Sequence, residues 1–89
     1  MRLAEEIRNF VFEHYIKPAK ERQETKLAVV SGDVHARMGL KDRMPAVCSV
    51  LRGSKLQSSF GIHLNQEIRL PNVKRDSSTN RFVFSIELL

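Results

Sequence analysis

The sequence predicts a small α+β domain in which three helices and a short strand are followed by a C-terminal β-hairpin. Three observations carry this prediction: helical spacing of apolar residues in the first 16 positions, two short helical stretches that each end at a glycine, and alternation of apolar and polar residues at the end. The 89 residues, of which 42% are apolar, suit one folded domain over 1–89.

The first helix is predicted from apolar residues that recur three and four positions apart between Leu3 and Val11, with charged residues between them. Pro18 lies near its end. Because proline disfavours helical backbone in the residue before it, the helix is expected to stop or kink near Ile16. Residues 17–26 then form a polar connector with room for an extra turn.

A short strand over 27–30 leads into the second helix, which is predicted over 32–38. Ser31 is a suitable N-cap, because its hydroxyl accepts a backbone N–H that has no partner in the first turn. Asp33 suits the positive end of the helix dipole. Gly39 is placed to close the helix in the left-handed conformation.

The third helix is predicted over 43–52, with Asp42 as its N-cap and Gly53 at its end. Pro45 is tolerated in the first turn, where its missing N–H has no helical partner. The apolar stripe of this helix, expected to face the core, consists of Val47, Val50 and Leu51. Residues 54–60 are long enough for one more turn.

The strongest strand prediction lies at 82–88, where apolar and polar residues alternate. One face of this strand holds Phe82, Phe84, Ile86 and Leu88. Its partner is predicted over 66–70, where Ile68 and Leu70 alternate with charged residues. The polar segment 71–80 between the two strands is suited to a hairpin loop.

The net charge of +5 is unevenly distributed. Residues 1–25 carry five basic and five acidic side chains, whereas residues 26–89 carry ten basic and five acidic ones, so the whole excess lies outside the first helix. A basic stretch is the electrostatic footprint of a phosphate-binding surface, although many basic proteins bind no nucleic acid.

Several classes of protein are not expected. No apolar run reaches the roughly 18 residues that span a bilayer, and the N-terminus has no signal-peptide core, so we expect a cytoplasmic protein. The histidines lie on three different segments, which argues against a metal site, and Cys48 is expected to be a small, partly buried residue without a role. With no paired carboxylates near a histidine, no phosphate loop and no nucleophile motif, neither an enzyme nor a cofactor is predicted.

Two stretches carry a family resemblance: DVHARMGL over 33–40 and AVCSVL over 46–51. The first is a short helix that ends in glycine and a large aliphatic residue, and the second supplies apolar residues that pack against it. With the flanking strands, this order resembles the winged helix-turn-helix DNA-binding family over nearly the whole chain. The connection from Gly39 to Val47 is longer than in the tightest members of the family, and the angle of the third helix depends on it.

The resemblance implies a DNA-binding protein, most simply a small transcriptional regulator. The helix over 43–52 would enter the major groove of double-stranded DNA, with the hairpin over 71–81 as a wing on the backbone. The residues expected to contact DNA are Arg43, Ala46, Ser49, Arg52, Lys55, Lys74, Arg75 and Arg81. A homodimer would match a palindromic site.

Two alternatives use the same fold differently. In the first, the helix over 43–52 or the apolar strand 82–88 docks another protein. In the second, the domain is a non-catalytic accessory module of a larger assembly, for example one that processes DNA, in which a partner supplies the chemistry. Salt separates phosphate binding from apolar docking, because only the former weakens steeply as salt is added.

Overall fold

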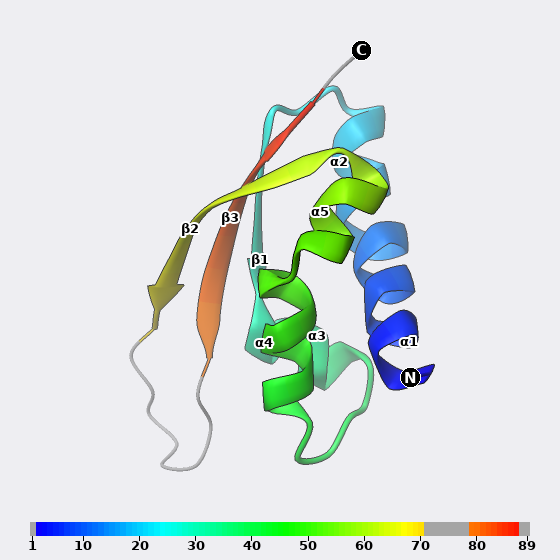
Figure 1. Ribbon diagram of the computed structural model, residues 1–89, viewed down its shortest axis with the longest axis vertical. Helices are drawn as coiled ribbons and strands as arrows, with labels where there is room; N and C mark the ends of the chain where they lie inside the picture. Colours follow the sequence, from blue (N-terminus) through cyan, green and yellow to red (C-terminus); the bar gives the residue numbers. More distant parts are fainter. Residues whose placement is uncertain (1, 71–78, 88–89) are drawn as a thin grey trace.

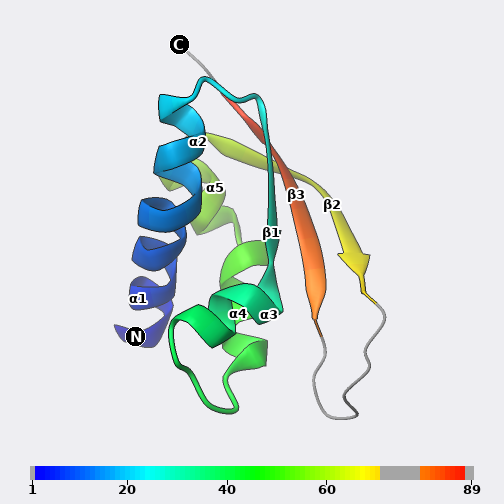
Figure 2. The ribbon, with the colours of Figure 1, turned by 180° about the vertical axis from the view of Figure 1, so that it is seen from behind.

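Every helix that the structure describes lies on one face of a three-stranded antiparallel sheet (Figure 1, Figure 2). The computed structural model describes residues 2–70 and 79–87. Its elements, in chain order, are α1 (Arg2–Val11), the π-helical turn η1 (Phe12–Ile16), α2 (Lys17–Glu21), β1 (Lys26–Val30), α3 (Ser31–Arg37), α4 (Met44–Arg52), α5 (Ser54–Phe60), β2 (Ile62–Arg69) and β3 (Asn80–Ile86).

The sheet has the order β1-β3-β2, so the last strand lies in the middle. Val29 of β1 and Glu67 of β2 both pair with Phe82 of β3. The resulting compact α+β domain, with a short first strand and a C-terminal β2–β3 hairpin, has a topology consistent with the winged-helix fold. The predicted fold class is confirmed.

The core lies between the helices and the inner face of β3. Phe82, Phe84 and Ile86 are buried, as their alternation predicts, while Leu88 lies outside the described residues. The predicted apolar stripe of the third helix is also confirmed. The core side chains that the helices contribute include Ile7, Val11, Val34, Val47, Val50, Leu51 and Leu56.

The first helix does not stop near Ile16, but its regular α-helical pattern is interrupted by a π-helical turn that ends at that residue. α1, η1 and α2 form one continuous helical segment over 2–21, with helical backbone angles at both junctions. In η1 the N–H of Lys17 donates to the carbonyl of Phe12, five residues earlier instead of four. The wider turn accommodates the proline ring, which would collide with a carbonyl in a regular helix interior.

Both predicted helix caps are wrong. Ser31 is the first residue of α3, whose N-cap is Val30, and its hydroxyl accepts a hydrogen bond from β3 instead of from its own helix. The N-cap of α4 is Arg43, and Asp42 lies in the preceding connection with φ of +55°. Gly39 closes α3 with φ of +67°, as predicted.

After Gly53 the helix has the range predicted, 54–60, whereas the strand that follows is longer than predicted. α5 spans seven residues, buries Leu56 and ends at Gly61, which has φ of +65°. β2 begins directly afterwards at Ile62, not at residue 66. The short apolar pattern of 66–70 therefore marked only the second half of this strand.

A β-bulge in β2 sets which face its second half presents. The pairing with β3 shifts between Leu64 and Gln66, so Asn65 is an extra residue. Because side chains of a strand alternate between faces, this insertion turns Glu67 toward the helices and Ile68 toward the outer face. The charged residue thus lies on the side of α4, and the apolar one points away from it.

Candidate nucleic-acid interface

The α3–α4 pair and the end of the hairpin lie at the same end of the molecule (Figure 1, Figure 2). The connection over 38–43, the start of α4, the end of β2 and the start of β3 gather there. One side of α4 packs into the core, and its other side exposes Pro45, Ser49 and Arg52. This side of α4 is where the sequence predicted DNA contacts.

The start of α4 is held by a histidine of α3. The backbone N–H of Arg43 donates to Nε2 of His35 at 3.1 Å, which requires Nε2 to be unprotonated. The Arg43 side chain is exposed, and its Nη1 donates to the carbonyl of Asp42 at 3.3 Å. Within the described part of the chain, no acidic side chain forms an ion pair with Arg43. Its charge therefore faces solvent.

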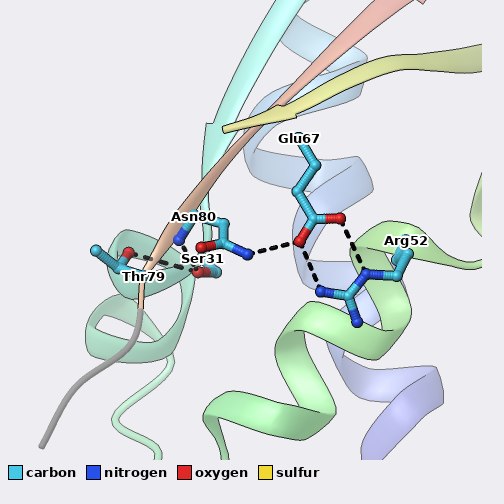
Figure 3. A network of polar contacts seen from close by, with 5 residues as sticks. All are labelled: Ser31, Arg52, Glu67, Thr79 and Asn80. Carbon is cyan, nitrogen blue, oxygen red and sulfur yellow. Dashed lines mark hydrogen bonds and ion pairs between the residues drawn. The ribbon is translucent and has the colours of Figure 1, made fainter. Parts of the chain in front are cut away.

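Arg52, at the end of α4, is bound by the hairpin (Figure 3). Its Nε and Nη2 donate to the two carboxylate oxygens of Glu67 at 3.0 and 2.6 Å, a bidentate pair. Asn80 Nδ2 donates to the same carboxylate at 2.6 Å. The guanidinium also lies 5.9 Å from the ring centroid of Phe82. A predicted DNA contact is thus paired within the protein.

The hydrogen bonds between Arg52 and Glu67 shift the pKa values of both side chains. The hydrogen bonds from Arg52, and then the one from Asn80, hold the pKa of Glu67 below its usual value, against a smaller opposing effect of burial. The carboxylate likewise raises the pKa of Arg52. Both groups are therefore ionised across the neutral range.

A second group of polar contacts joins the start of α3 to the start of β3 (Figure 3). The buried Ser31 Oγ accepts the backbone N–H of Asn80 at 3.0 Å and lies 3.4 Å from Thr79 Oγ1. Thr79 Oγ1 in turn accepts the backbone N–H of Gly32 at 2.9 Å. Through Asn80, these contacts connect with the Arg52–Glu67 pair, so one polar network links α3, α4, β2 and β3.

The other predicted contacts are scattered. Ser49 is exposed on α4, whereas Ala46 is half-buried against the core. Lys55 is exposed on α5, beyond the turn at Gly53. Arg81 is exposed on the outer face of the sheet, because it precedes the buried Phe82.

The structure therefore places Ser49 and Arg52 on the exposed side of α4 and Arg43 at its N-cap, and it separates Arg81 from all three. Lys74 and Arg75, which are predicted to flank the tip of the wing, lie outside the described residues. The polar residues that connect the hairpin to α4 were missed by the sequence analysis. One signal pointed to Glu67: it is the only acidic residue among residues 43–75, which hold six basic ones, and a lone carboxylate there is expected to be paired.

A separate cluster joins the N-terminal helix to α3. The Tyr15 hydroxyl donates to the carboxylate of Asp33, which lies 4.0 Å from Arg37 Nη1. The Arg37 guanidinium lies 5.3 Å from the ring centroid of Tyr15 and 5.8 Å from that of Phe10. Burial, and then the bond to Asp33, raise the pKa of Tyr15. Arg37 is thus engaged in packing.

In residues 2–70 and 79–87 no three histidine, cysteine, aspartate or glutamate side chains are grouped as metal ligands would be. No helix within these ranges has both the length and the apolar composition needed to cross a bilayer. Cys48, predicted to be partly buried, is buried, with 9% of its surface exposed. A scan against protein-family models gives no match for this chain, and searches of curated proteins and of solved structures give none either.

Proposed function

We propose that this domain binds double-stranded DNA, with the exposed side of α4 in the major groove and the hairpin on the adjacent backbone. The observation that carries the proposal is the exposed connection just before α4, where Lys41 and Arg43 lie on either side of Asp42 and form no ion pair in the described chain. The N-terminus of α4 adds a partial positive charge at the same place. A phosphate there would meet both sources of positive potential.

The composition of α4 favours affinity over selectivity. Arg43 is suited to a guanine edge or a phosphate, and the Ser49 hydroxyl to either. Pro45 adds a small apolar surface. With Arg52 paired to Glu67, we expect phosphate contacts to supply most of the binding energy and base contacts to add a modest sequence preference. In this proposal the domain acts as a small transcriptional regulator.

Salt-titrated binding to a random fluorescent duplex tests the proposal. We expect affinity to fall steeply between 50 and 200 mM salt, with about 0.9 in the log–log slope for each phosphate contacted. Arg43→Gln should lower both affinity and slope. Lys26→Gln is the matched control, because it removes the same charge from an exposed position at the opposite end of the sheet, paired with Ser85.

Two results would contradict DNA binding at this surface. One is wild-type binding that is absent or insensitive to salt. The other is an equal effect of Arg43→Gln and Lys26→Gln. Selection of bound sequences from the random duplex then measures the sequence preference.

The wing is tested separately. Lys74→Gln with Arg75→Gln should lower the slope by up to about 1.8 if both side chains contact phosphates. Arg81→Gln should leave the slope unchanged, because Arg81 lies on the outer face of the sheet. The reverse pattern would place the DNA on the outer face.

One observation favours a second candidate, protein docking. No helix of the described chain covers the outer face of the sheet (Figure 1, Figure 2), and Val30, Ile68 and Val83 lie half-buried there. In this candidate a second copy or another protein covers the face. Light scattering distinguishes it: Val83→Lys should disrupt a dimer and leave duplex affinity unchanged, whereas a wild-type monomer would exclude self-association.

A further inference from the structure

We infer that Arg52 is not a DNA contact, and that Glu67 is a positioning residue which uses Arg52 to hold the hairpin against α4. The inference rests on the proposed DNA-binding surface and deepens it. The residues concerned are Arg52, Glu67 and Asn80, here called the hairpin link (Figure 3).

The geometry restrains Arg52 on two sides. Two parallel N–H donors meet the two oxygens of Glu67, and the guanidinium also lies near the face of Phe82. A DNA phosphate would have to replace a carboxylate that already satisfies the same bidentate donor pattern. The bulge at Asn65 is what turns Glu67 toward Arg52, so the backbone of β2 presents the carboxylate to the helix.

The hairpin link lies where the wing begins. Asn80 is the first residue of β3 and pairs with Arg69, the last residue of β2. Its side chain bonds Glu67, and its backbone N–H bonds the buried Ser31 at the start of α3. The two strand ends next to residues 71–78 are thereby attached to both helices of the α3–α4 pair. The link therefore holds the end of β2 and the start of β3 in place relative to α4.

The paired charges of the hairpin link predict how the DNA affinity of its variants depends on salt. Arg52 and Glu67 carry opposite charges in contact, so together they present no net charge to DNA. A paired arginine releases no counterion when DNA binds, and it adds nothing to the salt slope. Arg43, which forms no such pair among the described residues, does add to it.

Two double variants and one control test the inference on the full chain with the random duplex. Arg52→Gln with Glu67→Gln removes the pair at constant net charge. Arg52→Glu with Glu67→Arg reverses its polarity, and the Asn80 amide has a buried, unpartnered Oδ1 that suits a donor at position 67 after the amide rotates. Arg43→Gln is the control. All affinities are measured well below the thermal midpoint of each variant, so that every chain is folded.

The neutral double variant should keep the wild-type salt slope while affinity falls by up to about fivefold, the upper limit expected for an exposed ion pair. The reversed pair should recover most of that affinity at the same slope. Arg43→Gln should lower the slope by about 0.9.

Three results separate the possibilities. A neutral double variant whose slope falls as in Arg43→Gln would overturn the inference, because Arg52 would then be a DNA contact. Unchanged affinity in the neutral double variant, or affinity that stays low in the reversed one, would overturn the positioning role of Glu67. Wild-type protein that does not bind duplex would instead refute the proposed function itself.

Discussion

Replacing Gly32 by alanine tests how closely the start of α3 meets the start of β3. A Cβ at position 32 would lie 2.7 Å from Thr79 Oγ1 and 3.3 Å from Thr79 Cβ, so a neighbouring group must move. The same Oγ1 accepts the Gly32 N–H at 2.9 Å. Alanine therefore displaces Thr79 and disturbs the polar network that includes Ser31.

The magnitude follows from three contributions. Overpacking of this kind costs about 1 to 3 kcal/mol. The lost hydrogen bond adds about 1 kcal/mol, which the better helix propensity of alanine roughly offsets. We expect a net loss of about 1 to 3 kcal/mol in the free energy of unfolding. For a domain of this size, each kcal/mol lowers Tm by about 4 to 8 °C.

Urea denaturation of four chains measures this effect: wild type, Gly32→Ala, Thr79→Ala and the double variant. Without the Thr79 hydroxyl, the 2.7 Å contact no longer exists, so Gly32→Ala should cost less in the Thr79→Ala background. The reasoning is refuted if Gly32→Ala is as stable as wild type, or if it costs the same in both backgrounds.

Three further predictions concern side-chain contacts. Arg52 lowers the pKa of Glu67, so the ion pair contributes fully to stability above the usual glutamate pKa, and this contribution is lost as pH falls through the pKa of the folded protein. Glu67→Gln should reduce the loss of stability at acid pH by less than about 1 kcal/mol, measured by denaturation at a series of pH values. An unchanged pH dependence would contradict the pairing. Burial and Asp33 raise the pKa of Tyr15, so the contribution of the protonated tyrosine to stability is complete below about pH 10 and is lost at higher pH. Tyr15→Phe should reduce the loss of stability at alkaline pH. Melting curves that coincide with those of the wild type at alkaline pH would count against the Tyr15–Asp33 hydrogen bond. His35→Ala removes the acceptor of the Arg43 N–H, just before α4. It should lower the free energy of unfolding by about 0.5 to 1.5 kcal/mol, measured by urea denaturation, and weaken duplex binding. Unchanged values of both would show that the histidine does not hold α4.

The sequence predicted most of the secondary structure, because the relevant signals are local. Alternation marked β3, helical spacing marked the apolar side of α4, and Gly39 marked the end of α3. Predictions from single residues were wrong where the same residue is compatible with more than one local structure. Pro18 predicted a break, yet one π-helical turn accommodates it. Ser31 matched a helix cap, yet its hydroxyl bonds β3.

The candidate surface was predicted in part for the same reason. The exposed side of α4, with Pro45, Ser49 and Arg52, follows from the apolar stripe on its other side, whereas Arg43 is exposed as the N-cap residue before the helix. What the sequence did not specify is which charged side chains meet. A contact between Arg52 and Glu67 joins residues 15 positions apart, and it requires the bulge at Asn65.

The sequence by itself thus determined the order of helices and strands, the buried faces of α4 and β3, and the excess of positive charge outside the first helix. Only the tertiary structure decided that Arg52 is bound by the hairpin and that Asn80 and Ser31, 49 positions apart, meet at the start of β3. For Arg52 the physical reason is strand register: one inserted residue in β2 exchanges the two faces of the strand, and no local pattern of apolar residues encodes that insertion. For Asn80 and Ser31 the reason is that the contact joins segments far apart in the chain, which local patterns do not relate.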